Sequence, residues 1–451
     1  MGMPIYDFVN SSTYGVLPLD VQGMASRCLL DLLGTGAVGA QTELARLATQ
    51  HAWRFFGPGG DAAAVPMLFD GRKASCVGAA LAGGMMIDSY DAHDGHVLTK
   101  GHAGCAILPG LLALCAANPD RTSGAEFLTA LVVGYEIAIR CGIAQHRISC
   151  DYHTSGAWNA LGVAAVAARL GRLDASQLRE ALGIAEYHGP RSQMMRCIDF
   201  PTMVKDGSGW GAMTGVSAAY LAADGFSGAP ALVVEDERVA DLWGDLGERW
   251  RIRELYFKPH PVCRWAQPAI EAVLSLTKGR PMQPHEISLV EIETFHNAVR
   301  LDQYRPASTE AAQYSLPFPV AAAIAHGTLR PSDIMSENLG DPEVLSLSHK
   351  IRLVECPKIE ARFPAERLAR ARIRLHDGQE LQSATLSARG DAATPLTDME
   401  IETKFHTFAA SALGSARAEL IHRAVVDLPD CKSLSTLIAL VCAPVTNKVA
   451  S

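Results

Sequence analysis

The chain has 451 residues, of which 48% are hydrophobic and 20% are charged, a composition that supplies a large core and excludes a disordered or collagen-like chain. Acidic residues outnumber basic ones by 48 to 40, so the net charge is −8, and basic residues form no run. Nucleic acids and anionic membranes are therefore not expected partners. An anionic substrate would need positive charge that is concentrated in a local pocket.

The N-terminal segment MGMPIYDFVNSS has no basic region followed by an apolar core, so we predict no signal peptide. No uninterrupted apolar stretch reaches the length of a membrane span. The eleven cysteines include no Cys-x-x-Cys pair, and several lie in apolar segments (Cys28, Cys105, Cys115 and Cys442). This pattern favours buried, reduced thiols in a cytoplasmic protein over a disulfide framework.

The first 250 residues are rich in Ala, Leu, Gly and Val, with apolar positions every three or four residues, which predicts helices. Asp174 is a plausible N-cap for one of them. Glycine-rich segments at 57–60, 189–191 and 206–211 separate the helical stretches. The best-defined predicted helices span 41–55, 125–144, 155–170 and 174–186.

The pattern changes near residue 257. Apolar and polar residues alternate at 287–295 and 371–387, which is the period of half-buried strands, and 351–356 is a third candidate strand. Asp377-Gly378 lies between two alternating runs and predicts a hairpin turn. Helical patterns occur between these strands and again after residue 396; they cover 264–278, 313–326, 397–411, 413–426 and 432–442.

These patterns predict a mainly α protein with an α+β insertion. An all-helical domain would be built from both chain ends, residues 1–256 and 396–451, and an α+β lid domain would span 257–395.

The segment DSYDAHDGHVLTKGHAGC at 88–105 contains three Asp, three His and one Lys between two apolar stretches. It could be a solvated loop, or a metal site at His93, Asp94 and His96, although it lacks a helical metal-ligand spacing. It could also perform acid–base chemistry. His102 precedes an apolar helix, whose dipole would lower the pKa of the imidazole and favour anions nearby, and Asp91 could orient or activate such a group.

Three further polar residues lie in apolar or glycine-rich surroundings: His153, Lys205 and Lys258. His102, His153 and Lys205 each precede a predicted helix, and helix N-termini favour anions. If His102, His153, Lys205 and Lys258 converge in the fold, they would form a carboxylate-binding pocket. The glycine-rich run 207–215 has neither the preceding strand nor the following acidic residue of a dinucleotide site. Cys263 could be a nucleophile, but no residue is marked as its base.

Several segments together resemble the MmgE/PrpD family, which includes 2-methylcitrate dehydratase, cis-aconitate decarboxylase and iminodisuccinate epimerase. The resemblance covers about residues 20–440 and depends on the shared order and spacing of its parts. These are MMIDSYDAHDGH and GHAGCAILPGLLAL, YHTSGAWNALGVAAVAARLGRL, MVKDGSGWGAMTGVSAAYLA, FKPHPVCRWAQPAIEAV and YSLPFPVAAAI.

The resemblance implies a helical domain formed by both termini with an inserted α+β lid, a homodimer, and an active site that needs neither a metal nor an organic cofactor. It implies chemistry on small di- or tricarboxylic acids, at a carbon next to a carboxylate. The matching active-site positions are Asp91, His102, His153, Lys205 and Lys258.

We place Gly95, Cys263, Arg264 and Phe318 among the substrate-binding candidates. Gly95 and Phe318 lack hydroxyls that relatives carry, and Cys263 stands where the decarboxylase branch has His. The residues at Cys263 and Phe318, where His and Tyr are missing, argue against cis-aconitate decarboxylase. We therefore predict a lyase that dehydrates a 2-methylcitrate-like hydroxy-polycarboxylate. The alternatives are an epimerase, a decarboxylase, a metal-dependent hydrolase, and an inactive carboxylate-binding protein. His93 and His96 are given no role.

Overall fold

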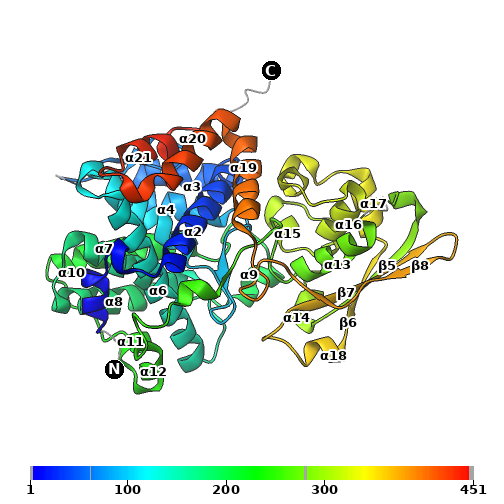
Figure 1. Cartoon of the computed structure of the whole chain (residues 1–451), viewed down its shortest axis with the longest axis horizontal. Helices are drawn as coiled ribbons and strands as arrows, with labels where there is room; N and C mark the ends of the chain where they lie inside the picture. Colours follow the sequence, from blue (N-terminus) through cyan, green and yellow to red (C-terminus); the bar gives the residue numbers. More distant parts are fainter. Residues whose placement is uncertain (1–3, 61, 279–281, 446–451) are drawn as a thin grey trace.

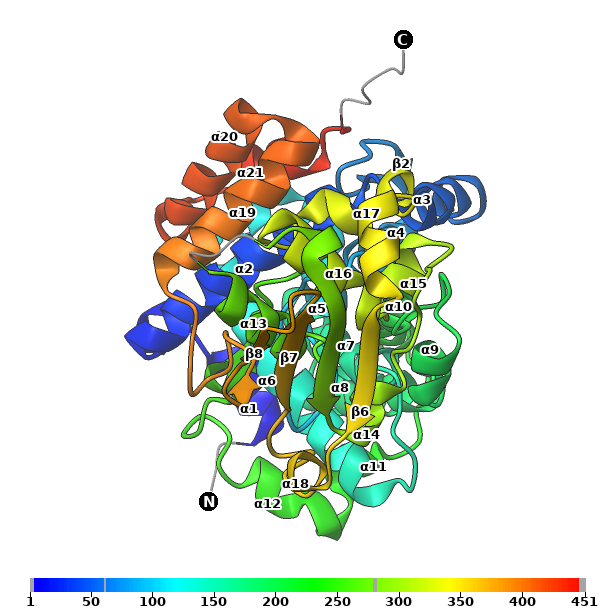
Figure 2. The same cartoon turned by 90° about the vertical axis from the view of Figure 1, so that its right-hand side faces the viewer.

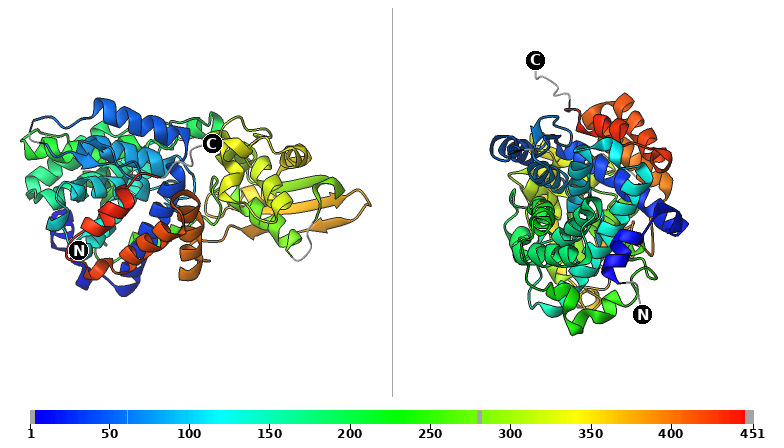
Figure 3. Two further views of the ribbon diagram at one scale, coloured as in Figure 1. Left: turned by 90° about the horizontal axis from the view of Figure 1, so that it is seen from above. Right: turned by 90° about the vertical axis from the view of Figure 1, so that its left-hand side faces the viewer.

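A computed structural model describes residues 4–60, 62–278 and 282–445. The chain forms a large helical part and a smaller part that contains a sheet, which lie side by side (Figure 1). This arrangement confirms the predicted fold class. Seen from above, the two parts follow one another along the longest axis of the molecule (Figure 3).

Both ends of the chain contribute to the helical part. The long helix α2 packs against α19 and α20 from the C-terminal end, and α21 packs against α5. Figure 1 shows α19, α20 and α21 in orange and red above the blue and cyan helices. The helices of this part are α1 (Ile5–Ser11), α2 (Leu19–Gly39), α3 (Glu43–Phe55), α4 (Cys76–Asp88), α5 (Gly104–Ala116), α6 (Gly124–Ile148), α7 (Gly156–Gly171), α8 (Ala175–His188), α9 (Met195–Asp199), α10 (Ser208–Ala223), α11 (Leu232–Glu235), α12 (Ala240–Trp243), α19 (Asp398–Leu413), α20 (Ser415–Val426) and α21 (Ser435–Cys442).

Small residues allow the central helices to approach closely. A Cβ at Gly215 of α10 would lie 2.4 Å from the carbonyl oxygen of Ala160 on α7, and one at Gly84 of α4 would lie 2.6 Å from the Cα of Gly209. Glycine at these contacts is therefore a packing requirement. The predicted N-cap is also present: the side chain of Asp174 accepts a hydrogen bond from the N–H of Gln177, at 2.9 Å.

Helix α6 is long and apolar enough to cross a bilayer, but 94% of its apolar window is buried inside the protein. That position is typical of a core helix. All eleven cysteines are free thiols, and Cys28, Cys105, Cys115 and Cys442 are buried as predicted.

The second part contains a five-stranded mixed sheet, which faces the viewer in Figure 2. Strand β5 pairs with β6 in parallel and with β7 in the antiparallel direction, and β8 and β9 both pair with β7. The elements are β5 (Ile287–Thr294), β6 (Ile351–Glu355), β7 (Leu368–Leu375), β8 (Glu380–Gln382) and β9 (Leu386–Ser387), with helices α13 (Gln267–Thr277), α14 (His296–Val299), α15 (Thr309–Gln313), α16 (Pro317–His326), α17 (Pro342–Ser348) and α18 (Pro357–Glu360).

The predicted hairpin forms around Gly378, whose φ of +90° is readily adopted by glycine. Its second strand is shorter than the alternating pattern indicated. The hydroxyl of Ser383 accepts the hydrogen bond of the N–H of Ala371 and so replaces a backbone acceptor of the ladder. The pairing consequently stops at Gln382 and resumes at Leu386.

Two further pairs of very short strands lie in the helical part: β1 (Val65–Pro66) with β2 (Lys73–Ala74), and β3 (Gly95–His96) with β4 (Leu255–Tyr256). The β3–β4 pair joins the polar segment 88–105 to the chain just before Lys258. Two-residue strands leave no readable alternation in a sequence, so neither pair was predicted.

Candidate active site

The polar segment 88–105 is buried between the C-terminal end of α4 and the start of α5. Asp91, His93, Asp94 and His96 are each at most 3% exposed. The solvated-loop interpretation is therefore wrong. The loop is held from the side by Lys404 of α19, whose ammonium donates to the carbonyl oxygen of Ala92 at 2.6 Å.

Asp91 and Lys258 form a buried ion pair, with 2.5 Å between Oδ1 and Nζ. The N–H of Asp91 donates to Oε1 of Gln313, at 2.8 Å. Burial alone would raise the pKa of the Asp91 carboxyl, but the ammonium groups of Lys258 and Lys205 outweigh it and hold this pKa well below its usual range. Asp91 is consequently a carboxylate at any physiological pH.

Lys205 lies on the other side of Gln313. Its ammonium donates to Oε1 of that amide at 2.7 Å and sits 4.5 Å from the centre of the Tyr314 ring. Its backbone φ is +47°, a conformation that costs a residue with a side chain about 1–3 kcal/mol. Among the described residues, no carboxylate oxygen lies within ion-pair distance of this ammonium, although it is only 2% exposed.

A cavity of about 680 Å³ reaches Lys205 from the surface of the helical part. Arg196 also lines it, so two cations face the space that an anion would enter. Asp91, His93 and His102 do not line this cavity and lie deeper in the protein. Lys205 is therefore the point where the cavity meets the buried cluster.

His102 lies two residues before the start of α5, as predicted. Burial comes first and the nearby ammonium of Lys258 second, and together they lower the pKa of the imidazole well below its ordinary value. Nδ1 lies 2.5 Å from the carbonyl oxygen of Asp94. Because a carbonyl can only accept, the hydrogen of the neutral ring sits on Nδ1, and Nε2 keeps a free lone pair.

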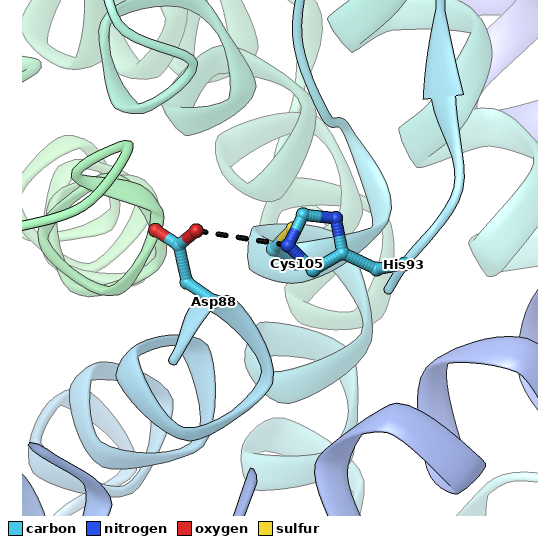
Figure 4. A group of neighbouring side chains, drawn as sticks. All are labelled: Asp88, His93 and Cys105. Carbon is cyan, nitrogen blue, oxygen red and sulfur yellow. Dashed lines mark ion pairs between the residues drawn. The ribbon is translucent and has the colours of Figure 1, made fainter. Parts of the chain in front are cut away.

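His93, which the sequence left without a role, lies in the middle of the cluster. Its ring packs edge-on against the ring of His102, with centroids 4.3 Å apart. Nε2 of His93 is 3.7 Å from Oδ1 of Asp88 and 3.8 Å from Oδ1 of Asp91. Figure 4 shows the ring turned toward the Asp88 carboxylate. Burial and the charge of Lys258 lower the pKa of His93 to about 3, so this ring is neutral too.

Three other carboxyl groups lie near the Asp91–Lys258 ion pair, and each has a pKa above its usual value. Burial, opposed by Lys205, raises the pKa of Asp88 to about 6. Burial and the neighbouring Asp88 raise the pKa of Asp206 to about 7, and burial and Asp31 raise that of Asp94 to about 8. Tyr135 donates its hydroxyl hydrogen to Oδ2 of Asp94 at 2.5 Å. Protonatable carboxyls thus lie next to a permanently ionised one.

Two groups of side chains here have ligand atoms close enough to share a metal ion: Asp91, His93 and His102, and Asp88, His93 and Cys105 (Figure 4). The chemistry of these side chains does not favour metal binding. The carboxylate of Asp91 is already neutralised by Lys258. Burial and Asp88 hold the pKa of the Cys105 thiol well above its usual value, so it is not a thiolate ligand.

His153 is not drawn into the cluster by any contact among the described residues. Nδ1 of its ring lies 2.8 Å from the carbonyl oxygen of Asp151, and its backbone pairs with that of Gln193. Gln193 and the neighbouring Thr154 both line the cavity that reaches Lys205. His153 is therefore a half-buried residue beside the cavity lining and does not line the cavity itself.

The four substrate-binding candidates fall into different surroundings. A Cβ on Gly95 would lie 2.5 Å from the hydroxyl of Tyr256 and 2.8 Å from Nδ1 of His102, so Tyr256 fills the space that a side chain would need. Arg264 pairs with Asp391 and stacks on the Tyr256 ring, with its guanidinium 4.7 Å from the ring centre. It thus supports the side chain that covers Gly95.

Cys263 and Phe318 are buried, at 7% and 1% exposure. Burial and the charge of Asp91 raise the pKa of the Cys263 thiol to about 12, so it is a neutral thiol and not a nucleophile at neutral pH. Phe318 belongs to the apolar core of the sheet-containing part.

Sequence reasoning missed Gln313 and Tyr256. Gln313 accepts from both Lys205 and Asp91, and its own amide donates to the carbonyl oxygen of Ser89 at 3.0 Å. It comes from α15, over 200 residues after the polar segment, and a single glutamine carries no sequence signal. Tyr256 lies two residues before Lys258, but its packing on Gly95 depends on the β3–β4 pair.

Comparison with known proteins identifies the family of the chain. Residues 4–244 match the model of the MmgE/PrpD N-terminal domain, and residues 260–428 match that of the MmgE/PrpD C-terminal domain. A cis-aconitate decarboxylase-like protein of Aspergillus oryzae is 24% identical, over 94% of this chain and 94% of its own length. The human cis-aconitate decarboxylase is 24% identical over 95% of this chain and 91% of its own. The mouse cis-aconitate decarboxylase is 25% identical, over 98% of this chain and 92% of its own length.

The two family models together cover nearly the whole chain. The model of the N-terminal domain covers the helices up to α12, and that of the C-terminal domain covers the sheet-containing part together with α19 and α20. The chain belongs to the MmgE/PrpD family.

Proposed function

We propose that this protein is a lyase that needs no cofactor and eliminates water from a small hydroxy-polycarboxylate of the 2-methylcitrate kind. The observation that carries the proposal is Lys205. A buried ammonium without a carboxylate partner is costly, and a carboxylate of the substrate would compensate it. The cavity brings such an anion to Lys205, and Lys258 lies on the opposite side of Gln313 and Asp91.

The chemistry that this cluster must perform is difficult. A proton on carbon next to a carboxylate is weakly acidic, because its removal adds negative charge to a group that is already charged. Fixed cations in a dry site stabilise that charge as it develops. Lys205 and Lys258 fill this role in the proposal.

We assign the role of base to His102. Its Nε2 lone pair is free, and its lowered pKa keeps the ring in the neutral form, the only form that can accept a proton, although it also makes the ring a weaker base. In the elimination, the C–H proton moves to Nε2 and the C–H electron pair forms the carbon–carbon double bond. The hydroxide leaves with a proton from the Asp88–His93 pair, as water. Asp88 has a pKa of about 6 and is therefore partly protonated near neutral pH.

A second candidate is decarboxylation of a cis-aconitate-like tricarboxylate. The names of the three relatives favour it. It would use the same lysines and would need a proton donor at the carbon left behind. Dehydration is the first choice because the sequence resemblance implies His in the decarboxylase branch at the position of Cys263.

Proton NMR of the purified protein in deuterated water tests both candidates. The panel contains 2-methylcitrate, citrate, cis-aconitate, iminodisuccinate and simpler 2-hydroxy diacids, each with and without a chelator. A new alkene proton from a hydroxy acid supports dehydration, and loss of a carboxylate from cis-aconitate supports decarboxylation. No change with any member of the panel would overturn the lyase proposal. Activity that is lost when the chelator is added would overturn the proposal that the enzyme needs no metal.

We also propose that the protein acts as a cytoplasmic homodimer. The buried free thiols suit a reducing compartment. Exposed apolar side chains gather near the cavity mouth, at Phe200, Val204 and Trp210, where a second copy could cover them. Light scattering after gel filtration should give about twice the chain mass, and a monomer would contradict the dimer.

A further inference from the structure

A second cluster of ligand-type side chains lies between α19 and α20. Nε2 of His406 on α19 is 3.2 Å from Nδ1 of His422 on α20, and 3.9 Å from Oε2 of Glu419. The two rings are close to perpendicular, with centroids 4.9 Å apart. The ligand atoms of all three residues lie within 4.8 Å of one another.

The spacing of the two ring nitrogens suits a shared metal ion. In a tetrahedral zinc site the metal–nitrogen bonds are about 2.0–2.1 Å long, which places two ligand nitrogens roughly 3.3 Å apart. The nitrogens of His406 and His422 are already 3.2 Å apart, where they share a hydrogen bond that a bound metal ion would replace. We propose that His406, His422 and Glu419 bind a divalent transition-metal ion, of which zinc is the representative, with water in the remaining position.

The surroundings prepare the three ligands. Arg423 donates to Oε1 of Glu419 at 2.7 Å, which leaves Oε2 as the oxygen on the side of His406. Nε2 of His422 has no hydrogen-bond partner among the described residues, and Oε1 of Glu402 lies 3.9 Å from it. When Nδ1 binds a metal, the hydrogen of the ring sits on Nε2, and a carboxylate at that position orients the ligand.

The site is open to an ion from solvent. The side chains of His406 and Glu419 are 36% and 45% exposed, whereas the ring of Phe405 lies behind both histidines and is buried. Lys404, which holds the active-site loop, is two positions from His406 and so points to nearly the opposite side of α19. The proposed metal therefore does not touch the substrate cluster, and this inference is independent of the proposed reaction.

Zinc titration of the full chain, freed of metal with a chelator, tests the proposal by calorimetry. The variants are His422→Ala, which removes a ligand, and Glu419→Gln, which removes the charged ligand at an exposed position. His376→Ala is the matched control, an exposed histidine in the β7–β8 turn. We expect the wild type and the control to bind one equivalent of zinc more than His422→Ala does. Glu419→Gln should bind this equivalent at least about tenfold more weakly than the wild type.

Cobalt substitution identifies the ligands independently. A tetrahedral nitrogen–oxygen site gives visible ligand-field bands without a thiolate charge-transfer band, and these bands should be absent in His422→Ala. Equal zinc stoichiometry in the wild type and His422→Ala would overturn the proposal, and so would a thiolate band that persists in that variant. Thermal unfolding in the presence of chelator checks that the variants fold; if His422→Ala fails, the Glu419→Gln result decides.

Discussion

The hydroxyl of Tyr256 stands where a side chain at Gly95 would begin, since a Cβ on that glycine would lie 2.5 Å from it. We expect Gly95→Ala to cost about 1–3 kcal/mol in the free energy of unfolding, because neither Tyr256 nor His102 has room to retreat. Turnover should also fall, since the displaced ring of His102 is the proposed base. Urea unfolding and steady-state rates measure both effects. Gly57→Ala is the control, because no atom lies near its Cβ, and it should change neither stability nor turnover. If Gly95→Ala also changes neither, the β3–β4 pair adjusts to the added methyl group at little cost.

Replacement of Lys205 by Met removes the unpaired ammonium and keeps the length of the side chain. Turnover should drop at least about a hundredfold, as expected when a preorganised charge that stabilises the transition state is lost. The free energy of unfolding should change little, because the desolvation cost of the buried ammonium is removed together with its attraction to Asp91 and Asp88. Lys73→Met, at an exposed lysine, is the control. Near-normal turnover in the Lys205 variant would exclude this residue from the mechanism.

Replacement of His102 by Gln removes the lone pair of Nε2 while keeping a side chain of similar size. We expect a loss of turnover of at least about a hundredfold with little change in the thermal midpoint. His188→Gln, on the exposed end of α8, should behave like the wild type. If the His102 variant keeps its rate, the base lies elsewhere, and His93 would be the next residue to replace.

The protonated state of Asp94 makes stability depend on pH. Its pKa rises from 3.8 in the unfolded chain to about 8 in the folded protein, so the folded state holds an extra proton between these values. The stability that this proton contributes is complete below about pH 4 and is lost as the pH rises through 8, at about 1.4 kcal/mol per pH unit for one proton.

Asp94→Asn is neutral at every pH and should lose this slope. Urea unfolding at pH 5, 6, 7 and 8 compares the two proteins, and the difference isolates Asp94 from Asp88 and Asp206. Parallel curves would mean that Asp94 is ionised in the folded state.

The thiol of Cys263 should be unreactive in the native protein. It is buried and its pKa is raised to about 12, whereas Cys150 is exposed. Brief treatment with iodoacetamide at pH 7.5, followed by peptide mass spectrometry, should find the label on Cys150 and not on Cys263. Urea should expose both thiols. Rapid labelling of Cys263 in the folded protein would mean that its thiolate forms there and would restore it as a nucleophile candidate.

The sequence was informative where the signal is local. Periodicity located the helices and three strands of the sheet, and the Asp174 cap and the Gly378 turn form as their residue types predict. The polar segment 88–105 was also recognisable, because its density of titratable groups is unusual among apolar helices.

What the sequence could not supply depends on contacts between distant segments. Gln313 acts by lying between Lys205 and Asp91, and nothing in its neighbours along the chain marks that position. His93 and His153 show the same limit in opposite directions. Sequence reasoning assigned His93 no role within its polar segment and set His153 among the active-site candidates, yet tertiary packing places His93 in the centre of the cluster and His153 beside residues that line the cavity.

The contact of Lys404 with Asp31 and with the carbonyl oxygen of Ala92 has a consequence for synthesis of the chain. The loop that carries Asp91 and His93 is translated early, but the cation that secures it comes more than 300 residues later. Until α19 has emerged from the ribosome, the carboxylate of Asp31 lacks its hydrogen-bonded cation and the loop lacks one of its fixed points. The active centre therefore reaches its final form only near the end of translation, and a nascent chain that stops before α19 carries every proposed catalytic residue but not the lysine that fixes their loop.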